Sequence, residues 1–185
     1  MAYEFNFDFS LSHKSVQELV KEIKRYEKEL GKAKEYILNA LADYTLERVK
    51  YYISATTGHT SYIPTGELLN SIQKSPIMGN MIKIYTTLAY AKFVEFGTGV
   101  NGSKKSHPET NIHGWSYKTE PHRYVNKKTG EITEKKGWIY IGKDGQTHYT
   151  EGLEAHMFMY KAREDLKENY IRIAKQALKE RGLIK

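Results

Sequence analysis

A long run of apolar side chains at helical spacing dominates the C-terminal end of the chain. It predicts one amphipathic helix from about Phe158 to Glu180, with Gly182 as the stop signal that follows it. Such a helix hides its apolar face only by packing on other elements, so the chain needs a folded body around it. The apolar positions step by three or four residues: Met159, Ala162, Leu166, Tyr170, Ile173 and Ala177.

The N-terminal half predicts further helix. Ser12 or Ser15 can cap a helix that runs toward Leu30, and Gly31 is expected to end or interrupt it. From residue 32 to about 55 the helical pattern resumes with two apolar stripes. A helix with two stripes must be covered on two sides, so it is either the central helix of a small domain or a helix at a subunit boundary. The stripes are Ile37, Leu41 and Tyr44, and Leu38, Ala42, Leu46, Val49 and Ile53.

The first residues alternate between aromatic and polar side chains. Tyr3, Phe5, Phe7 and Phe9 fall on one face of an extended chain, and the residues between them are Glu4, Asn6 and Asp8. This alternation predicts a strand with one apolar face. The strand is either part of the core, or residues 1–12 form an arm that docks on a neighbouring subunit.

The middle of the chain changes character twice. A loop leads into a short helix capped by Thr65, and two strands follow at 72–77 and 81–87, joined by a turn at Gly79-Asn80. Residues 100–150 then form an inserted β-rich segment, with strands expected at 115–119, 122–126 and 138–141 and hairpin turns at 128–130 and 143–145. Together these elements predict an α+β fold: an N-terminal strand and helices, a small, mostly antiparallel sheet and a long C-terminal helix, in one domain over 1–185.

Composition narrows the protein classes. Cys is absent, which excludes disulfides, Cys-ligated metals and thiol catalysis. The formal charge of +7 is uneven: residues 1–97 carry a net +1, residues 98–150 carry +4, residues 151–156 carry −2 and residues 157–185 carry +4. The 15 Tyr outnumber the 6 Phe and 2 Trp together, and Tyr is enriched at protein interfaces. The composition therefore suits a protein that works through contacts with other proteins.

The sequence contains near matches to catalytic and cofactor-binding motifs, but none of them is complete. Residues 97–104 read GTGVNGSK, but Ser103 separates Lys104 from the second glycine of a phosphate-binding loop, and polar coil is expected where that loop needs a helix. The histidines have no metal-ligand spacing, so those of the inserted segment are expected to bond to water. Glu95 is the best candidate for a perturbed carboxylate, with a hydrogen-bonding or interface role expected. No catalytic residue, metal or cofactor is predicted. The four histidines of the inserted segment are His107, His113, His122 and His148.

Three segments, in this order, resemble a known pattern. Residues 65–72 read TGELLNSI, residues 90–99 read YAKFVEFGTG, and residues 158–162 read FMYKA. They resemble the tail-completion, or neck, family of tailed bacteriophages and prophages, a minor tail component at the head–tail joint. Its members carry T-G-x-L-x-x-S-I, Y-A-x-x-V-E-F-G-T and P-F-[LM]-x-x-A. The resemblance covers about 55–180. The chain departs from the family pattern in two places. The proline expected before Phe158 is absent, because His156-Met157 precede that residue, and segment 100–150 is long.

The resemblance implies a structural virion protein of a siphovirus-type phage and no enzyme. It implies a homo-oligomeric ring, six-fold in the family, at the head–tail junction around the DNA exit channel. Its partners would be other copies, the connector or stopper, the tail-terminator or tail-tube proteins and, without sequence specificity, the passing DNA. The resemblance also implies that no membrane is involved and that assembly takes place in the bacterial host cytoplasm. The motif residues expected at a subunit interface or in a structural corner are Tyr90, Phe93, Val94, Glu95, Phe96, Gly97, Thr98, Gly99 and Phe158.

Within this corner, Phe93, Val94 and Phe96 are expected to pack the sheet on the terminal helix. Glu95 and Thr98 are expected to make polar contacts, within the subunit or to the next one. The plain alternative is a strand that ends in a glycine turn.

The inserted segment also contains six lysines that are expected at the surface. They could contact DNA, contact a partner protein, or simply be solvated. Protein docking or solvation is favoured, because a channel through which DNA slides has reason to avoid strong phosphate contacts. The competing function is a basic nucleic-acid-binding or metal-dependent nuclease-like protein. These lysines are Lys104, Lys105, Lys127, Lys128, Lys135 and Lys136.

Overall fold

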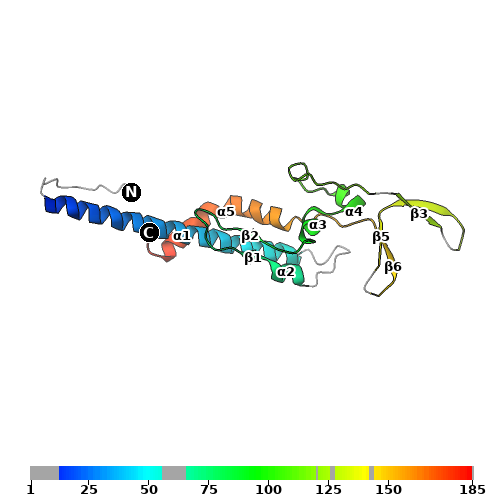
Figure 1. Cartoon of the computed structure of the whole chain (residues 1–185), viewed down its shortest axis with the longest axis horizontal. Coiled ribbons are helices and arrows are strands. Elements are labelled where there is room, and N and C mark those ends of the chain that lie inside the picture. The colour runs from blue at the N-terminus through cyan, green and yellow to red at the C-terminus, as the bar shows by residue number, and fades with distance from the viewer. Residues whose placement is uncertain (1–12, 56–65, 120, 126–127, 142–143, 185) are drawn as a thin grey trace.

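The computed structural model describes residues 13–55, 66–119, 121–125, 128–141 and 144–184, and its architecture is α+β. Two long helices, α1 (His13–Ala55) and α5 (Phe158–Glu180), lie side by side along much of an elongated molecule (Figure 1). They run in opposite directions, because Arg48 pairs with Asp165 while Arg181 lies over the Tyr36 ring. The predicted bounds of the C-terminal helix are confirmed. The predicted strand at 3–9 and the arm at 1–12 lie outside the described residues.

Helix α1 passes through Gly31 without a break, so the prediction that Gly31 ends or interrupts the helix was wrong. A glycine inside a helix costs about 1 kcal/mol relative to alanine. Good helix formers such as Glu29, Leu30 and Ala33 surround Gly31, and this local preference outweighs the cost of one glycine.

The core lies where four helices meet. Short helices α2 (Glu67–Ser71) and α3 (Ala91–Phe96) pack against the C-terminal half of α1 and the start of α5. Helix α2 begins at Gly66 as its N-cap, one residue after the expected cap at Thr65, which lies outside the described residues. Residues 91–96 are helical, which excludes the alternative of a strand there. The buried apolar residues are Val49, Ile53, Leu68, Ile72, Ala91, Val94, Phe158 and Ala162.

The residues of the two apolar stripes of α1 are half-buried or buried by other elements of the chain. Helix α5 packs along α1, and α2 and the hairpin of β1 (Gln73–Lys74) and β2 (Ile84–Tyr85) also contact it. The predicted turn at Gly79-Asn80 is confirmed, since Met78 and Met81 exchange backbone hydrogen bonds of 2.9 and 3.2 Å across it. The strands themselves are much shorter than predicted.

The inserted segment holds α4 (Gly99–Lys104) and two separate hairpins. The first ribbon pairs β3 (Pro121–Val125) with β4 (Ile132–Lys136), and the second ribbon pairs β5 (Trp138–Ile141) with β6 (Thr147–Thr150). Residues 115–119 form no strand and residues 99–104 are helical rather than coil, which corrects two expectations. The strand at 138–141 is confirmed. In the described residues all strand pairs are antiparallel, but they form three two-stranded sheets instead of one.

Both ribbons point away from the helical body (Figure 1). Every residue of β4 and β5 is exposed, and Ile141 keeps 77 % of its surface accessible. An isolated two-stranded hairpin is at best marginally stable in water. The ribbons therefore present apolar side chains and open strand edges that the rest of the described chain does not cover.

Candidate functional site

The corner between α3 and the start of α5 contains Glu95, the acid of the second motif. Glu95 is 7 % exposed and accepts hydrogen bonds of 2.9 Å from the backbone amides of Met159 and Tyr160. These amides belong to the first turn of α5, which has no partner for them inside the helix. Met157, the N-cap residue, is in the left-handed conformation and gives no side-chain cap. A carboxylate from a distant helix therefore caps α5, where the helix dipole also favours a negative charge.

His107 supplies a third donor to the same carboxylate. Its Nε2 atom lies 3.2 Å from Glu95 Oε1, and its Nδ1 atom accepts a 3.0 Å hydrogen bond from the Glu109 amide. Because a backbone amide can only donate, Nδ1 carries no proton and Nε2 carries it. His107 is 2 % exposed, so the expectation that the loop histidines bond to water was wrong for this residue.

Aromatic side chains enclose this hydrogen-bonded pair. Phe96 contacts the His107 and Trp115 rings, with centroids 4.3 and 5.2 Å away. The Trp115 indole donates to the Gly97 carbonyl at 3.0 Å, and the Tyr117 hydroxyl donates to the Phe96 carbonyl at 2.8 Å. The start of the inserted segment is thereby tied back to α3. Phe93 and Phe96 pack against this segment instead of joining a sheet to α5, which corrects the expectation for both.

The two ends of the inserted segment lie against each other at the glycines. Thr98 N donates to Leu153 O at 2.7 Å, and Leu153 N donates to Thr98 O at 3.1 Å. A Cβ atom at Gly152 would lie 2.1 Å from Thr98 O, and one at Gly97 would lie 2.6 Å from Ala155 N. Only glycine permits so close a backbone approach, and both residues have positive φ. The motif glycine Gly97 thus fixes where the ribbons leave the body.

The first and third motifs meet the second in this corner. Leu68 and Ile72 of the first motif, Val94 of the second and Phe158 of the third share the buried core. Tyr90 packs on that core, and its hydroxyl donates to Glu67 at 3.2 Å. Gly99 is buried at the start of α4. An interface role for the motif residues stays a prediction.

A salt bridge joins the inserted segment to α5 beside this corner. Arg163 Nη2 lies 2.7 Å from Glu109 Oε1, and this guanidinium holds the pKa of Glu109 below its ordinary value. A hollow of about 350 Å³ lies next to the pair, with Phe96 and His113 in its wall. The carboxylate oxygens of Glu95 already accept three hydrogen bonds. The arrangement fastens α3, α5 and the start of the inserted segment together.

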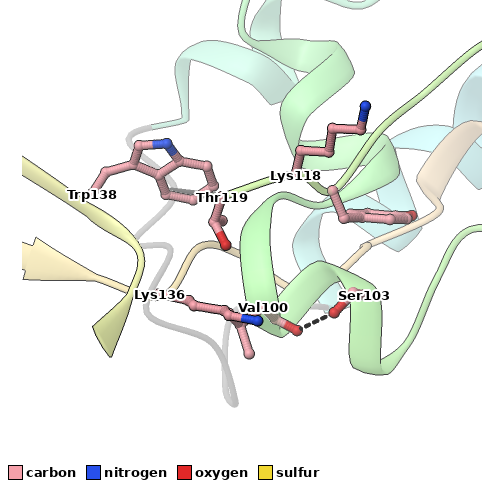
Figure 2. Close-up of a pocket in the computed structure, with 7 residues that line it drawn as sticks. Val100, Ser103, Lys118, Thr119, Lys136 and Trp138 are labelled. Atoms are coloured by element: carbon pink, nitrogen blue, oxygen red, sulfur yellow. Dashed lines mark hydrogen bonds between the residues drawn. The ribbon is translucent and has the colours of Figure 1, made fainter. Parts of the chain in front are cut away.

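A larger hollow of about 960 Å³ separates α4 from the base of the ribbons (Figure 2). Val100 and Ser103 come from α4, Thr119 and Trp138 also line the hollow, and Lys136 reaches toward the α4 side. Ser103 donates to the Val100 carbonyl at 2.8 Å. The walls mix an indole, aliphatic carbons, hydroxyls and ammonium groups. Neither the periodicity of the sequence nor any motif predicts this hollow.

The predicted lysines do not form one cluster. Lys104 and Lys105 are exposed at the end of α4, Lys128 lies beside the first hairpin turn, and Lys136 lines the larger hollow. The Lys135 ammonium lies 5.6 Å from the centre of the Tyr149 ring. Lys127 lies outside the described residues. The described lysines therefore follow α4 and the first ribbon in a dispersed arrangement.

Among the described residues, no three His, Asp or Glu side chains gather as they would around a metal ion. His148 bonds to Asp144 at 3.0 Å, and His113 lies 3.9 Å from Glu109. No helix in the described part of the chain is long and apolar enough to cross a membrane. Comparisons with protein-family models, curated proteins and solved structures found no match to this chain.

Proposed function

We propose that this protein is a structural subunit of the head–tail neck of a tailed phage, in which copies form a ring around the DNA exit channel. One observation supports this most strongly. The three segments that carry the resemblance are far apart in the sequence, yet they supply most of one core, and the motif carboxylate Glu95 caps the helix that the third segment begins. Segments that form one structural unit are more informative than three separate short matches.

The surface of the molecule supports an assembly role independently. Both ribbons project from the body with their apolar side chains exposed, including Val125, Ile132 and Ile139. Exposed apolar surface of this kind marks sites of protein contact. In a closed ring each subunit needs two different faces. The ribbons can supply one of them by docking on a neighbouring copy or on an adjacent ring of the neck.

The nuclease-like alternative requires ligands for a catalytic metal, and the described residues offer no such group. The experiment that separates the two functions uses the purified full chain. Electron microscopy and multi-angle light scattering should find closed rings with a central channel, and a nuclease assay with Mg²⁺ or Mn²⁺ should find no cleavage of duplex DNA. A monomer at all concentrations that cleaves DNA would contradict the proposal.

The lysines are tested separately with the double variant Lys104→Gln, Lys105→Gln. If these side chains serve docking or solvation, duplex DNA should be retained weakly by both proteins even at low salt. Strong retention by the unmodified chain that falls steeply with salt and is lost in the variant would instead indicate phosphate contacts.

A further inference from the structure

The segment 115–119, whose last three residues line the larger hollow, has the exposure pattern of a strand. Trp115, Tyr117 and Thr119 are half-buried, while Ser116 and Lys118 between them are exposed. The Trp115 indole and the Tyr117 hydroxyl both donate to carbonyls at the end of α3. Exposure that alternates from one residue to the next is typical of an extended backbone, because its side chains point to opposite sides in turn.

No described strand lies beside this segment. Among the described residues, the backbone groups of 116–119 form no backbone–backbone hydrogen bond, and the Lys118 amide donates only to the Ser116 hydroxyl, at 3.4 Å. Backbone groups without a ladder are a template for pairing with another extended chain. In such pairing the main chain supplies the hydrogen bonds, and the side chains beside it supply specificity. The hollow of about 960 Å³ provides space next to the segment.

We infer that residues 3–9 of a second copy of this chain dock as a strand along residues 115–119 in this hollow. Residues 3–9 alternate between aromatic and polar side chains, which is the pattern of a strand with one apolar face. Neighbouring strands place their side chains on shared faces. The docked strand can therefore set its aromatic side chains on the face of Trp115 and Tyr117, and its polar side chains on the face of Ser116 and Lys118.

The charges of the two segments are complementary. Residues 1–12 contain Glu4 and Asp8 and no basic residue, so they carry a net −2. Lys118 and Lys136 line the hollow, and none of the described residues that line it is acidic. The whole stretch 98–150, with all its acidic residues counted, carries a net +4. An acidic, aromatic strand therefore fits this hollow better than a basic or purely aliphatic one.

Residues 3–9 of the same chain are too far away to occupy the hollow. Helix α1 is continuous from His13 to Ile53, a length of about 60 Å, and Ile53 shares the core with Val94 of α3. The hollow lies still farther along the molecule, beside α4 (Figure 1). The ten residues from 3 to 13 span at most about 36 Å when fully extended. The docked strand therefore comes from another copy.

The two halves of this contact lie toward opposite ends of the elongated molecule, because α1 begins at one end and the hollow lies toward the other (Figure 1). Each copy gives residues 3–9 to one neighbour and receives the same segment from another. Such a heterologous contact closes into a ring when its rotation closes, and it needs no two-fold axis. The inference deepens the proposed function, and it rests on that proposal for the closed ring.

A charge exchange in the purified full chain tests this contact. Two double variants, Glu4→Lys with Asp8→Lys and Lys118→Glu with Lys136→Glu, should each weaken self-association at least ten-fold in sedimentation equilibrium. An equimolar mixture of the two should recover it, because each altered segment then meets an altered hollow and each unaltered segment meets an unaltered one. The matched control, Lys21→Glu with Lys28→Glu on the exposed part of α1, should leave it unchanged.

Three results would overturn the inference. They are equal weakening by the control, no recovery in the mixture, and weakening by the hollow variant without weakening by the Glu4→Lys, Asp8→Lys variant. The last result would assign the hollow to a different segment or partner.

Cross-linking checks the position of the contact, because the chain contains no Cys. Asn6→Cys mixed with Ser116→Cys should give a dimer with a short bismaleimide linker, which tolerates a shift in strand register. Asn6→Cys mixed with Lys28→Cys is the control and should give at least ten-fold less. Equal yields, or no dimer from the first mixture, would contradict the docking site. If rings form but both tests fail, this inference fails and the proposed function stands. If the unmodified chain is a monomer throughout, both fail.

Discussion

The corner around Glu95 and the two ribbons belong to one continuous stretch of chain but differ in how they are held. The corner has buried donors matched to buried acceptors, a shared core and two glycines that allow backbones to meet. The ribbons are held mainly by their own ladders and by a few contacts between them, such as the 3.0 Å hydrogen bond from the Tyr149 hydroxyl to the Lys136 carbonyl, and β4 and β5 are exposed throughout. The difference indicates that contacts within the chain fix the corner far more firmly than they fix the ribbons. The predictions below separate these two kinds of region.

The largest effect is expected at Gly152. In Gly152→Ala the new Cβ would collide with the Thr98 carbonyl oxygen, 2.1 Å away, at a φ of +96° that alanine rarely adopts. The free energy of unfolding should fall by about 4 kcal/mol or more, measured by denaturant titration. Gly145→Ala in the second hairpin turn is the control, because its φ is also positive but its Cβ meets open space; it should cost about 1 kcal/mol. Equal losses of unfolding free energy in the two variants would contradict the close backbone approach at Gly152.

Next in size is removal of the Glu95 carboxylate. Glu95→Ala strands two helix amides and the His107 Nε2 donor in a buried site, so the free energy of unfolding should fall by about 3 kcal/mol. The exposed Glu154→Ala, on the segment leading into α5, should change it by less than about 0.5 kcal/mol. Thermal melts of both variants beside the unmodified chain measure the contrast. A loss below 1 kcal/mol in Glu95→Ala would mean that the cap does not hold α5.

A moderate pH effect is expected from His156, a buried residue whose amide donates to Val94 O at 3.0 Å. Burial, and secondly the nearby Lys161 charge, lower the pKa of His156 from its ordinary value of 6.5. The unfolded chain therefore binds a proton more readily than the folded chain, and stability falls as the pH drops below about 6.5. The melting temperature should fall by a few degrees between pH 7.5 and 5.5.

His156→Gln removes this titration and should flatten the change over the same interval. Glu109, whose pKa is lowered by Arg163, loses its contribution only below about pH 4.3, outside this interval. An unchanged pH dependence in His156→Gln would exclude His156 as the cause.

The smallest effect on stability is expected on the ribbons. Ile141→Ser at an exposed strand position should change the free energy of unfolding by less than about 0.5 kcal/mol, whereas Val94→Ala in the core should cost about 2 kcal/mol. Assembly should show the opposite ranking of the two variants. Ile141→Ser should need a higher protein concentration to form oligomers, as measured by light scattering. Normal assembly by Ile141→Ser would remove this ribbon face from the interface.

The elements predicted correctly from the sequence are those marked by a periodic apolar pattern or by a glycine turn. The bounds of α5 follow from the three- and four-residue steps, and the hairpin turns follow from Gly79, Gly130 and Gly145, which all have positive φ. Continuity through Gly31 was missed, because a single glycine is a weak stop signal inside strong helix formers. Helix α3 was missed because six residues are too few to show a helical period.

The contacts of the candidate corner lay beyond sequence reasoning. Glu95 was singled out as a carboxylate between two phenylalanines, but its partners at 107, 159 and 160 are set by tertiary packing, which no local pattern records. The burial of His107 had no local signal either, since it lies in a turn-rich segment between Ser106 and Pro108 with no apolar periodicity. The hollow of Figure 2 arises only where α4 meets the base of the ribbons.

The proposed neck role depends on self-assembly of this chain. The most direct measurement is electron microscopy of the purified full-length protein, with particle classes averaged for symmetry. A closed ring of identical subunits around a central channel, with the ribbons in contact with a neighbouring copy or at the ring's outer faces, is the predicted result. Single elongated subunits at every concentration tested would contradict it.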